Sequence, residues 1–409
     1  RPVSVIADQL RFFLNSTAQE CFLLIFVVPA LATISYANRE GRRWLIFTVA
    51  AFFCTGILFM IIANTELDLN AQDILQVYFL PPWILIYIWA GYGIGFFSLL
   101  VLRVLRRLKT GLIPAMLLSA AWLLLPIGGI YMNWQQAHLR GHDFGLKYGE
   151  MLLKSIPQDA VLFVGTDSSY AIPMYMKWVQ GRRPDAAILS INSLSNYSYR
   201  AEAWRNAPDI AFLTEKDYAE AFSLYAGAPA AAAGIYGTQK VGRMNAFLLL
   251  KLYQNLIDER PIFYDQGLPI EWVLDYAVPS GLLMEIRRER LESIESDVVD
   301  ADRSYWRKLE EDLLANRHFL HDLAARQKFS KCRSNIGYLY LHRKMYPEAT
   351  EALEQAIRFS DRNIEAYAFL ALIHKQQGEH EEAVNVFDEY LRRDTWNTSA
   401  RAFADSLSR

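Results

Sequence analysis

The chain has 409 residues, of which 53% are hydrophobic and 21% charged, and its formal net charge is −2. This balance excludes a broad nucleic-acid-binding surface, because such surfaces need clustered cations to displace counterions from phosphates. Cys21 and Cys54 lie in apolar runs and Cys332 stands alone in the polar part, so that part cannot contain a disulfide framework. The first third is strongly apolar and the rest has the composition of a soluble protein, which predicts more than one domain.

Residues 1–20 are predicted to form an amphipathic helix. Apolar side chains recur at helical spacing from Val3 to Leu14. Such a helix lies on the outer membrane surface or, alternatively, links an upstream crossing to the first one present here. The chain begins with Arg1 rather than Met, and we expect an N-terminal part to precede it.

Residues 21–133 are predicted to contain four transmembrane helices. Each apolar run approaches or exceeds the ~20 residues that cross a bilayer. The four runs are Cys21–Ala37, Trp44–Ala63, Phe79–Leu102 and Leu112–Tyr131.

The charges between these runs predict the orientation. The first and third links are basic, whereas the second, Asn64–Tyr78, has three acids and no Lys or Arg. The positive-inside rule places the basic links in the cytoplasm. We therefore expect an integral protein of a bacterial inner membrane, with everything after Asn133 in the periplasm, or in a lumen if the source is eukaryotic. The charged link residues are Arg39, Arg42, Arg43, Arg103, Arg106, Arg107 and Lys109, and the acids Glu66, Asp68 and Asp73.

Residues 134–290 are predicted to form a Rossmann-like α/β domain outside the membrane. Helical and strand patterns alternate there, which favours a mainly parallel sheet. The predicted helices are Asp143–Ser155, Ile172–Gln180 and Asn245–Asp258. The predicted strands are Ala160–Gly165, Ala186–Ile191, Pro261–Tyr264 and an edge strand within Gly281–Ile286.

The loop after the first strand is the predicted substrate site. It reads GTDSSYAIP, so no dinucleotide-binding glycine motif is present. Open α/β sheets bind ligands at the carboxyl ends of their strands, which makes Asp167 and Ser168 candidate site residues. Asp167 is expected in a polar cleft near Tyr170 and Tyr175. The alternative is that Asp167 and Ser168 only cap the next helix.

Residues 291–409 are predicted to be a helical tetratricopeptide repeat domain. Small and apolar residues recur 34 positions apart, the period of these repeats. The recurring pairs are Gly337 and Ala371, Ala349 and Ala383, Leu353 and Phe387, and Ala356 and Tyr390. Trp396–Leu407 is expected to cap the stack and Asp302–Gln327 to complete its inner side. Such a surface binds a protein partner or, alternatively, serves as a structural stalk.

Two further clusters could carry chemistry. Glu66, Asp68 and Asp73 lie where an enzyme using a lipid-linked sugar would place its general base, although acids are also favoured there by topology alone. His138 and His142 have the spacing of metal ligands on a helix, although polar residues also anchor a helix at a membrane exit. A divalent metal is thus conceivable but not indicated, and no cofactor is assigned.

Several segments resemble a GT-C-class membrane glycosyltransferase family of the protein O-mannosyltransferase type. Bacterial members often end in tetratricopeptide repeats. The resemblance covers roughly residues 20–290, the C-terminal half of the family. The segments are FLPPWILIYIWAGYGIG (Phe79–Gly95), His142–Leu194, ERPIFY (Glu259–Tyr264) and VPSGLLMEI (Val278–Ile286), with Gly165, Asp167, Pro173, Tyr175 and the GRRPD turn (Gly181–Asp185) as the most specific positions.

The resemblance implies transfer of a sugar, such as mannose, from a polyprenyl-phosphate donor to a protein or glycan acceptor outside the membrane. Members of this class place their general base in the first outer loop, so the catalytic residue is expected upstream of this chain, which alone should be inactive. Ser168, Ser169 and Tyr170 replace the acidic and amide-rich loop of many members. The competing hypothesis is a membrane-anchored, non-catalytic scaffold that assembles an envelope complex through its repeats.

Overall fold

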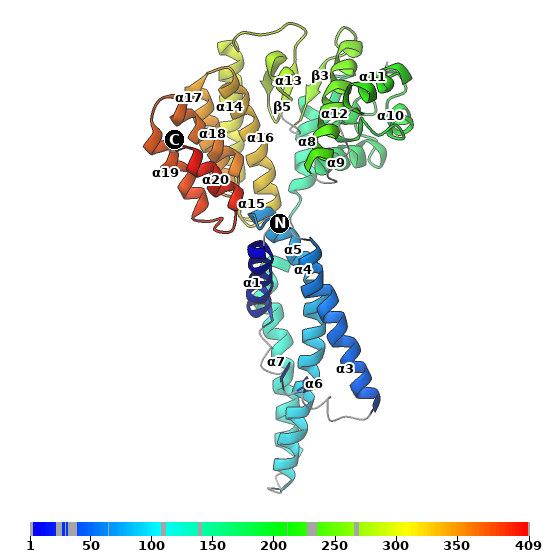
Figure 1. Ribbon diagram of the computed structural model, residues 1–409, viewed down its shortest axis with the longest axis vertical. Helices are drawn as coiled ribbons and strands as arrows, with labels where there is room; N and C mark the ends of the chain where they lie inside the picture. Colours follow the sequence, from blue (N-terminus) through cyan, green and yellow to red (C-terminus); the bar gives the residue numbers. More distant parts are fainter. Residues whose placement is uncertain are drawn as a thin grey trace. The chain divides into compact units, whose positions relative to one another are not determined.

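The computed structural model describes residues 3–21, 27–28, 30–31, 39–63, 65–107, 112–137, 141–210, 212–226, 235–265 and 270–407 (Figure 1). The chain divides into two compact units. Unit 1 contains residues 1–138 and 391–407, and unit 2 contains residues 139–390. Each unit has hydrophobic cores of its own.

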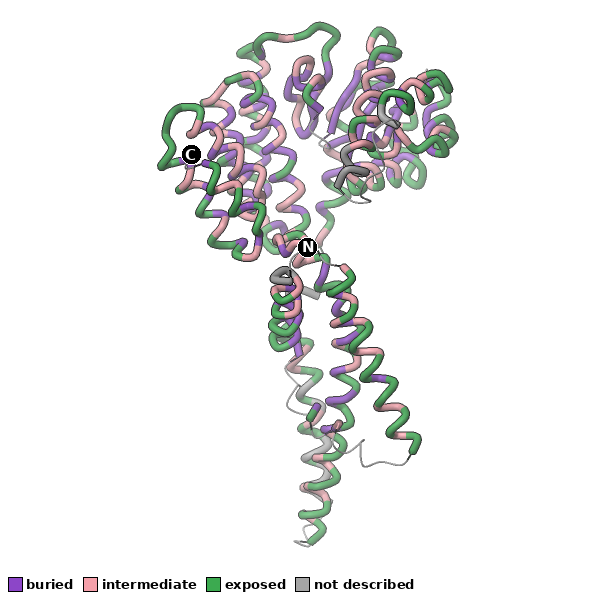
Figure 2. The backbone as a smooth tube through the Cα atoms, viewed as in Figure 1, coloured by how far each residue is buried: buried purple, intermediate pink, exposed green. Residues whose placement is uncertain are grey.

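Unit 1 is helical. Two of its helical segments, residues 39–63 and α6 (Leu80–Arg107), are long and apolar enough to cross a membrane, and only 17% and 22% of their most apolar windows are buried. Figure 2 shows them largely in the colour of exposed residues. The first predicted crossing lies mostly outside the described residues, and the fourth forms α7. The elements are α1 (Val3–Glu20), α3 (Arg39–Phe52), η2 (Phe53–Leu58), α4 (Phe59–Ala63), α5 (Leu69–Tyr78), α6 (Leu80–Arg107), α7 (Leu112–Ala137) and α20 (Thr398–Leu407).

Helix α1 packs on the other helices of unit 1. Phe12 and Phe13 are buried in one cluster with Met60 and Phe79. Gly56 allows this approach, because a Cβ atom there would come within 2.8 Å of the Phe13 ring. The apolar side of the predicted amphipathic helix therefore contacts protein at these positions.

Unit 2 contains a five-stranded sheet in the order β2-β1-β3-β5-β4. The strands β1, β2 and β3 are parallel, whereas β5 pairs antiparallel with both β3 and β4. The sheet is therefore mixed rather than mainly parallel, because a tight hairpin adds two antiparallel strands. The predicted edge strand, β5, lies inside the sheet. The strands are β1 (Val161–Val164), β2 (Ala187–Ser190), β3 (Ile262–Tyr264), β4 (Ala277–Ser280) and β5 (Leu283–Ile286).

Helices cover both faces of this sheet. Phe163 of β1 faces a core that includes Leu248 and Leu252 of α12, and Leu162 faces a second core that includes Leu152 of α8. The α/β helices of unit 2 are α8 (Phe144–Ser155), α9 (Asp167–Trp178), α10 (Tyr199–Asn206), α11 (Glu215–Ala226), α12 (Ile235–Leu256) and α13 (Glu271–Tyr276), with a 3₁₀ turn η3 (Ile191–Ser193).

The predicted repeats form two helical hairpins. Gly337 is needed where the two helices of the first hairpin pack on each other, because a Cβ atom there would lie 2.8 Å from Leu353. The expected inner helix is α14, whose Arg303 contacts Glu351 of α17 at 2.7 Å. The expected stretch Asp302–Gln327 is in fact divided among three helices. The helices are α14 (Ser296–Leu314), α15 (Arg317–His321), α16 (Leu323–His342), α17 (Tyr346–Phe359), α18 (Ile364–Gln376) and α19 (His380–Leu391).

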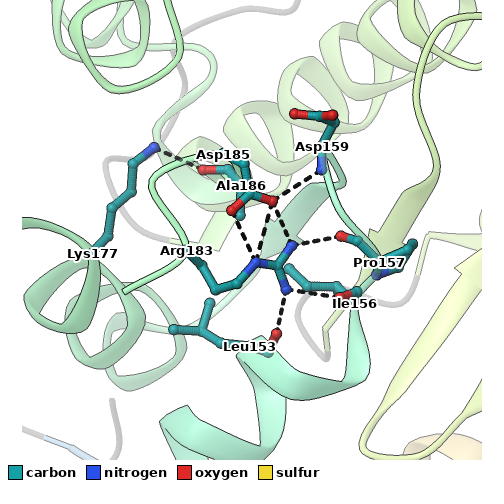
Figure 3. A network of polar contacts seen from close by, with 8 residues as sticks. All are labelled: Leu153, Ile156, Pro157, Asp159, Lys177, Arg183, Asp185 and Ala186. Atoms are coloured by element: carbon teal, nitrogen blue, oxygen red, sulfur yellow. Dashed lines mark hydrogen bonds and ion pairs between the residues drawn. The ribbon is translucent and has the colours of Figure 1, made fainter. Parts of the chain in front are cut away.

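The GRRPD turn fastens the amino ends of β1 and β2 (Figure 3). The Arg183 guanidinium donates to the carbonyls of Leu153, Ile156 and Pro157 at 2.6–2.8 Å and to the Asp185 carboxylate. Asp185 also accepts from the backbone N–H of Asp159 at 3.0 Å. The motif therefore has a clear structural role, at the edge of the sheet opposite to the carboxyl ends of the strands.

Candidate functional site

The carboxyl ends of β1 and β3 meet in unit 2. The backbone N–H of Asp265, directly after β3, donates to the Phe163 carbonyl of β1 at 2.8 Å. Thr166 follows β1 and caps α9 through a hydrogen bond from the Ser169 N–H. This edge of the sheet is therefore lined by short polar side chains and by a helix N-terminus, a combination that favours anions.

Five side chains form a polar cluster at this edge, which we call the strand-end centre: Tyr148, Thr166, Ser169, Asp265 and Lys328. Lys328 of α16 donates to the hydroxyls of Ser169 at 2.5 Å and Thr166 at 3.2 Å. Its Nζ lies 3.8 Å from Asp265 Oδ2 and 4.7 Å from the centre of the Tyr148 ring. The centre thus brings a cation from the repeat region to the end of the sheet.

The two charged side chains of the centre, Asp265 and Lys328, differ in burial. The Asp265 carboxylate is fully buried, whereas the Lys328 side chain is 16% exposed. Burial, and next the nearby Asp265, raise the pKa of the Tyr148 hydroxyl well above its ordinary value. Tyr148 therefore stays protonated and donates to Asp265 at 3.3 Å. The ammonium and the hydroxyl groups of Lys328, Thr166 and Ser169 are those that could face a bound anion.

The residues predicted from the loop lie around this centre rather than in it. Asp167 and Ser168 are exposed in the first turn of α9, and Asp167 makes no hydrogen bond or ion pair with a described residue. Tyr170 donates to Glu202 at 2.7 Å, and burial raises the pKa of its hydroxyl. Tyr175 is 47% exposed. The N-cap of α9 is their neighbour Thr166, and Asp167 and Ser168 follow it in the first turn of the helix.

Two of the three acids of the link Asn64–Tyr78, Glu66 and Asp68, accept hydrogen bonds at helix ends within unit 1. Glu66 accepts from the hydroxyl of Thr398 and from the N–H and hydroxyl of Ser399, at the start of α20. Asp68 caps α5 by accepting from the Ala71 N–H at 2.7 Å. Asp73 lies within α5 and is partly buried. Their role as a general base stays a prediction.

Sequence reasoning weighs the two histidines that have the spacing of metal ligands against a role as polar anchors at a membrane exit. The Nδ1 atom of His142 lies 3.4 Å from Oδ2 of Asp322, and the His142 ring contacts the ring of His318. His138 lies outside the described residues. Among the residues that are described, no group of three or more His, Cys, Asp or Glu could hold a metal ion.

Sequence reasoning missed most of the strand-end centre. Thr166 and Ser169 belong to the loop that was singled out, and Asp265 directly follows a predicted strand. Lys328 and Tyr148 gave no signal, because both belong to helices whose packing on the sheet depends on the tertiary fold.

Comparison with known families finds one match. A tetratricopeptide repeat model matches residues 364–395, which span α18, α19 and the turn after them. The predicted repeat is therefore confirmed in this segment. No curated protein matches the chain.

Proposed function

We propose that this chain is the acceptor-binding part of an integral membrane glycosyltransferase that uses a polyprenyl-phosphate sugar. The observation that carries the proposal is the strand-end centre, because the segment Gly165–Tyr175, which holds some of the most specific positions of the family resemblance, contributes Thr166 and Ser169 to it. A cation, two hydroxyls and a helix N-terminus suit a ligand that carries phosphate or hydroxyl groups. The apolar helices of unit 1 supply the anchor, and the repeats supply a surface for a protein acceptor or partner.

Lys328 provides the test of this proposal. In membrane vesicles that contain the protein at its natural length, we expect transfer of labelled sugar from a polyprenyl-phosphate mannose to a membrane-extrinsic acceptor. We expect Lys328→Met to lower that transfer at least tenfold, because it removes the cation that contacts the hydroxyls of Thr166 and Ser169.

The control is Lys331→Met, one turn along the same helix, where the side chain is 50% exposed and pairs with Glu365. It should leave transfer unchanged. Thermal unfolding of both variants separates a lost contact with the ligand from a lost fold. Absence of transfer with every polyprenyl-phosphate sugar tried, in the unsubstituted protein, would contradict the proposal.

A non-catalytic scaffold is the second candidate. It is favoured by Glu66 and Asp68, since both acids are engaged at helix N-termini. Tetratricopeptide repeats commonly mediate contacts between proteins, so such a scaffold would act through α16–α19. Specific binding of one envelope protein by the repeats, together with a chemically inert full-length protein, would favour this candidate.

The proposed orientation predicts a labelling pattern. In a background without native cysteines (Cys21→Ala, Cys54→Ser and Cys332→Ala), we expect Asp68→Cys to react with an impermeant thiol reagent in intact spheroplasts. Arg42→Cys should react only after the membrane is permeabilised, because the basic links stay in the cytoplasm. The opposite pattern would overturn both the orientation and any chemistry on the outer side.

A further inference from the structure

Strand β2 forms one edge of the sheet in unit 2, and β1 is its neighbour there. The backbone N–H of Ala187 donates to the Ala160 carbonyl at 3.0 Å, so Ala187 faces β1. Successive residues of a strand turn their backbone groups alternately to the two sides, which directs those of Ala186, Ile188 and Ser190 away from β1. A row of such groups at an open edge is a template for pairing with another chain.

Buried polar side chains take up two of these outward-facing groups. Lys177 of α9 donates from its Nζ to the Ala186 carbonyl at 2.7 Å (Figure 3). Asn206 of α10 donates from its side-chain amide to the Ile188 carbonyl at 2.5 Å. Lys177 and Asn206 are only 8% and 4% exposed. Lys177 also donates to the main-chain carbonyl of Asn206 at 2.8 Å, which fixes the end of α10 beside β2.

A tyrosine at the start of α10 takes up a third group. The hydroxyl of Tyr199 accepts from the backbone N–H of Ser190 at 2.8 Å. Tyr170 of α9 donates to Glu202 of α10 at 2.7 Å, so α9 holds α10 here as well as through Lys177. Side chains of α9 and α10 thus form the hydrogen bonds that a neighbouring strand would otherwise form with β2.

The sequence of β2 shows which partner an open edge would attract. The stretch AAILSIN, Ala186–Asn192, has no charge and no proline, a composition that favours strand pairing between identical segments. The other edge strand, β4, contains Pro279, which has no N–H to donate. Charge and proline are the usual protection of an edge, and β2 has neither in its own sequence.

We propose that α10 is a built-in cover of the β2 edge, which prevents a second copy of this chain from pairing its own β2 strand there. Two identical edges can pair antiparallel about a two-fold axis, because each presents the same row of groups to the other. The hydrogen bonds of Lys177, Asn206 and Tyr199 keep that row occupied. The inference does not depend on sugar transfer.

The test removes these hydrogen bonds and measures self-association of the full chain in detergent by sedimentation velocity. Tyr199→Phe keeps the ring and removes the acceptor of the Ser190 N–H, so it should raise the association constant at least threefold. Lys177→Met combined with Asn206→Leu frees two carbonyls and should raise it at least tenfold. Tyr199→Phe decides the question if the double variant does not fold.

Hydrogen exchange locates the contact. In the double variant, the amides of residues 186–191 should exchange at least tenfold more slowly where the chain is dimeric than after dilution to the monomer. The dimer that Tyr199→Phe forms should protect the same amides. In the unsubstituted chain, exchange of these amides should not depend on the protein concentration.

Arg183→Ala is the matched control for stability. It loosens the amino ends of β1 and β2 but leaves the contacts of Lys177, Asn206 and Tyr199 in place. Its association constant should therefore equal that of the unsubstituted chain. Variants as monomeric as the unsubstituted chain, association that leaves residues 186–191 unprotected, or equal association in Arg183→Ala would overturn the proposal.

Discussion

Replacing Arg333 by Leu is expected to lower the free energy of unfolding of unit 2 by about 3–5 kcal/mol, because breaking a buried ion pair leaves an uncompensated charge inside the protein. The Arg333 and Asp302 side chains are 3% and 2% exposed and lie 2.7 Å apart. Arg333 also donates to Gln355 at 2.6 Å and lies 5.1 Å from the centre of the Trp306 ring. This single side chain therefore joins α14, α16 and α17.

The matched control is Arg303→Leu. Arg303 of α14 makes its ion pair with Glu351 of α17, but the side chains are 33% and 42% exposed. Exposed pairs contribute about 1 kcal/mol or less, so this variant should be much milder. Unfolding in urea, followed by tryptophan fluorescence, measures both. Equal losses in the two variants would contradict the argument from burial.

The double variant Arg333→Leu with Asp302→Leu separates charge from packing. If the stranded carboxylate causes the loss, removing it should restore at least half of the lost stability, even though Tyr340 and Gln355 each lose a partner. A double variant no more stable than the single one would show that Arg333 acts mainly by packing on Trp306.

The helical repeats could be predicted from the sequence because their signal is local and periodic. The positions that recur after 34 residues, such as Ala349 and Ala383, are fully buried in the second helix of each hairpin. Strands β1, β2 and β3 were also predictable, since each is a short apolar run between turn residues. The predicted bounds of these strands differ from the observed ones by at most one residue at each end.

The hairpin and the polar contacts were much harder to predict. Strand β4 contains Pro279, which argues against a strand interior, and it is tolerated because β4 is the edge of the sheet. Lys328 lies more than 150 residues from Ser169 along the chain, and no periodicity links such positions. The candidate loop was therefore recognised from its place after β1, whereas the partners that complete its chemistry depend on the tertiary fold.

Replacing Arg183 by Ala is expected to cost about 2–4 kcal/mol, because three backbone carbonyls and the Asp185 carboxylate lose a charged donor together. The adjacent Arg182 gives a control, since it makes an exposed pair with Glu150 at 2.6 Å. Arg182→Ala should cost about 1 kcal/mol or less. Comparable losses at both positions, measured by urea unfolding at neutral pH, would contradict the structural role of the turn.

The hydrogen bonds between Arg183 and Asp185 also make the stability of unit 2 depend on pH in the acid range. The hydrogen bond from Arg183, helped by the one from the Asp159 N–H, outweighs the effect of burial and lowers the pKa of Asp185 to about 2, below its ordinary value. A carboxyl group whose pKa is lower in the folded state stabilises the fold above its unfolded pKa and loses that effect as the pH falls. We therefore expect about 2 kcal/mol of stability to disappear between pH 4 and pH 2. Urea unfolding across this range should show a flatter profile for Arg183→Ala and keep most of the slope for Arg182→Ala, because only the first substitution returns Asp185 to its ordinary pKa.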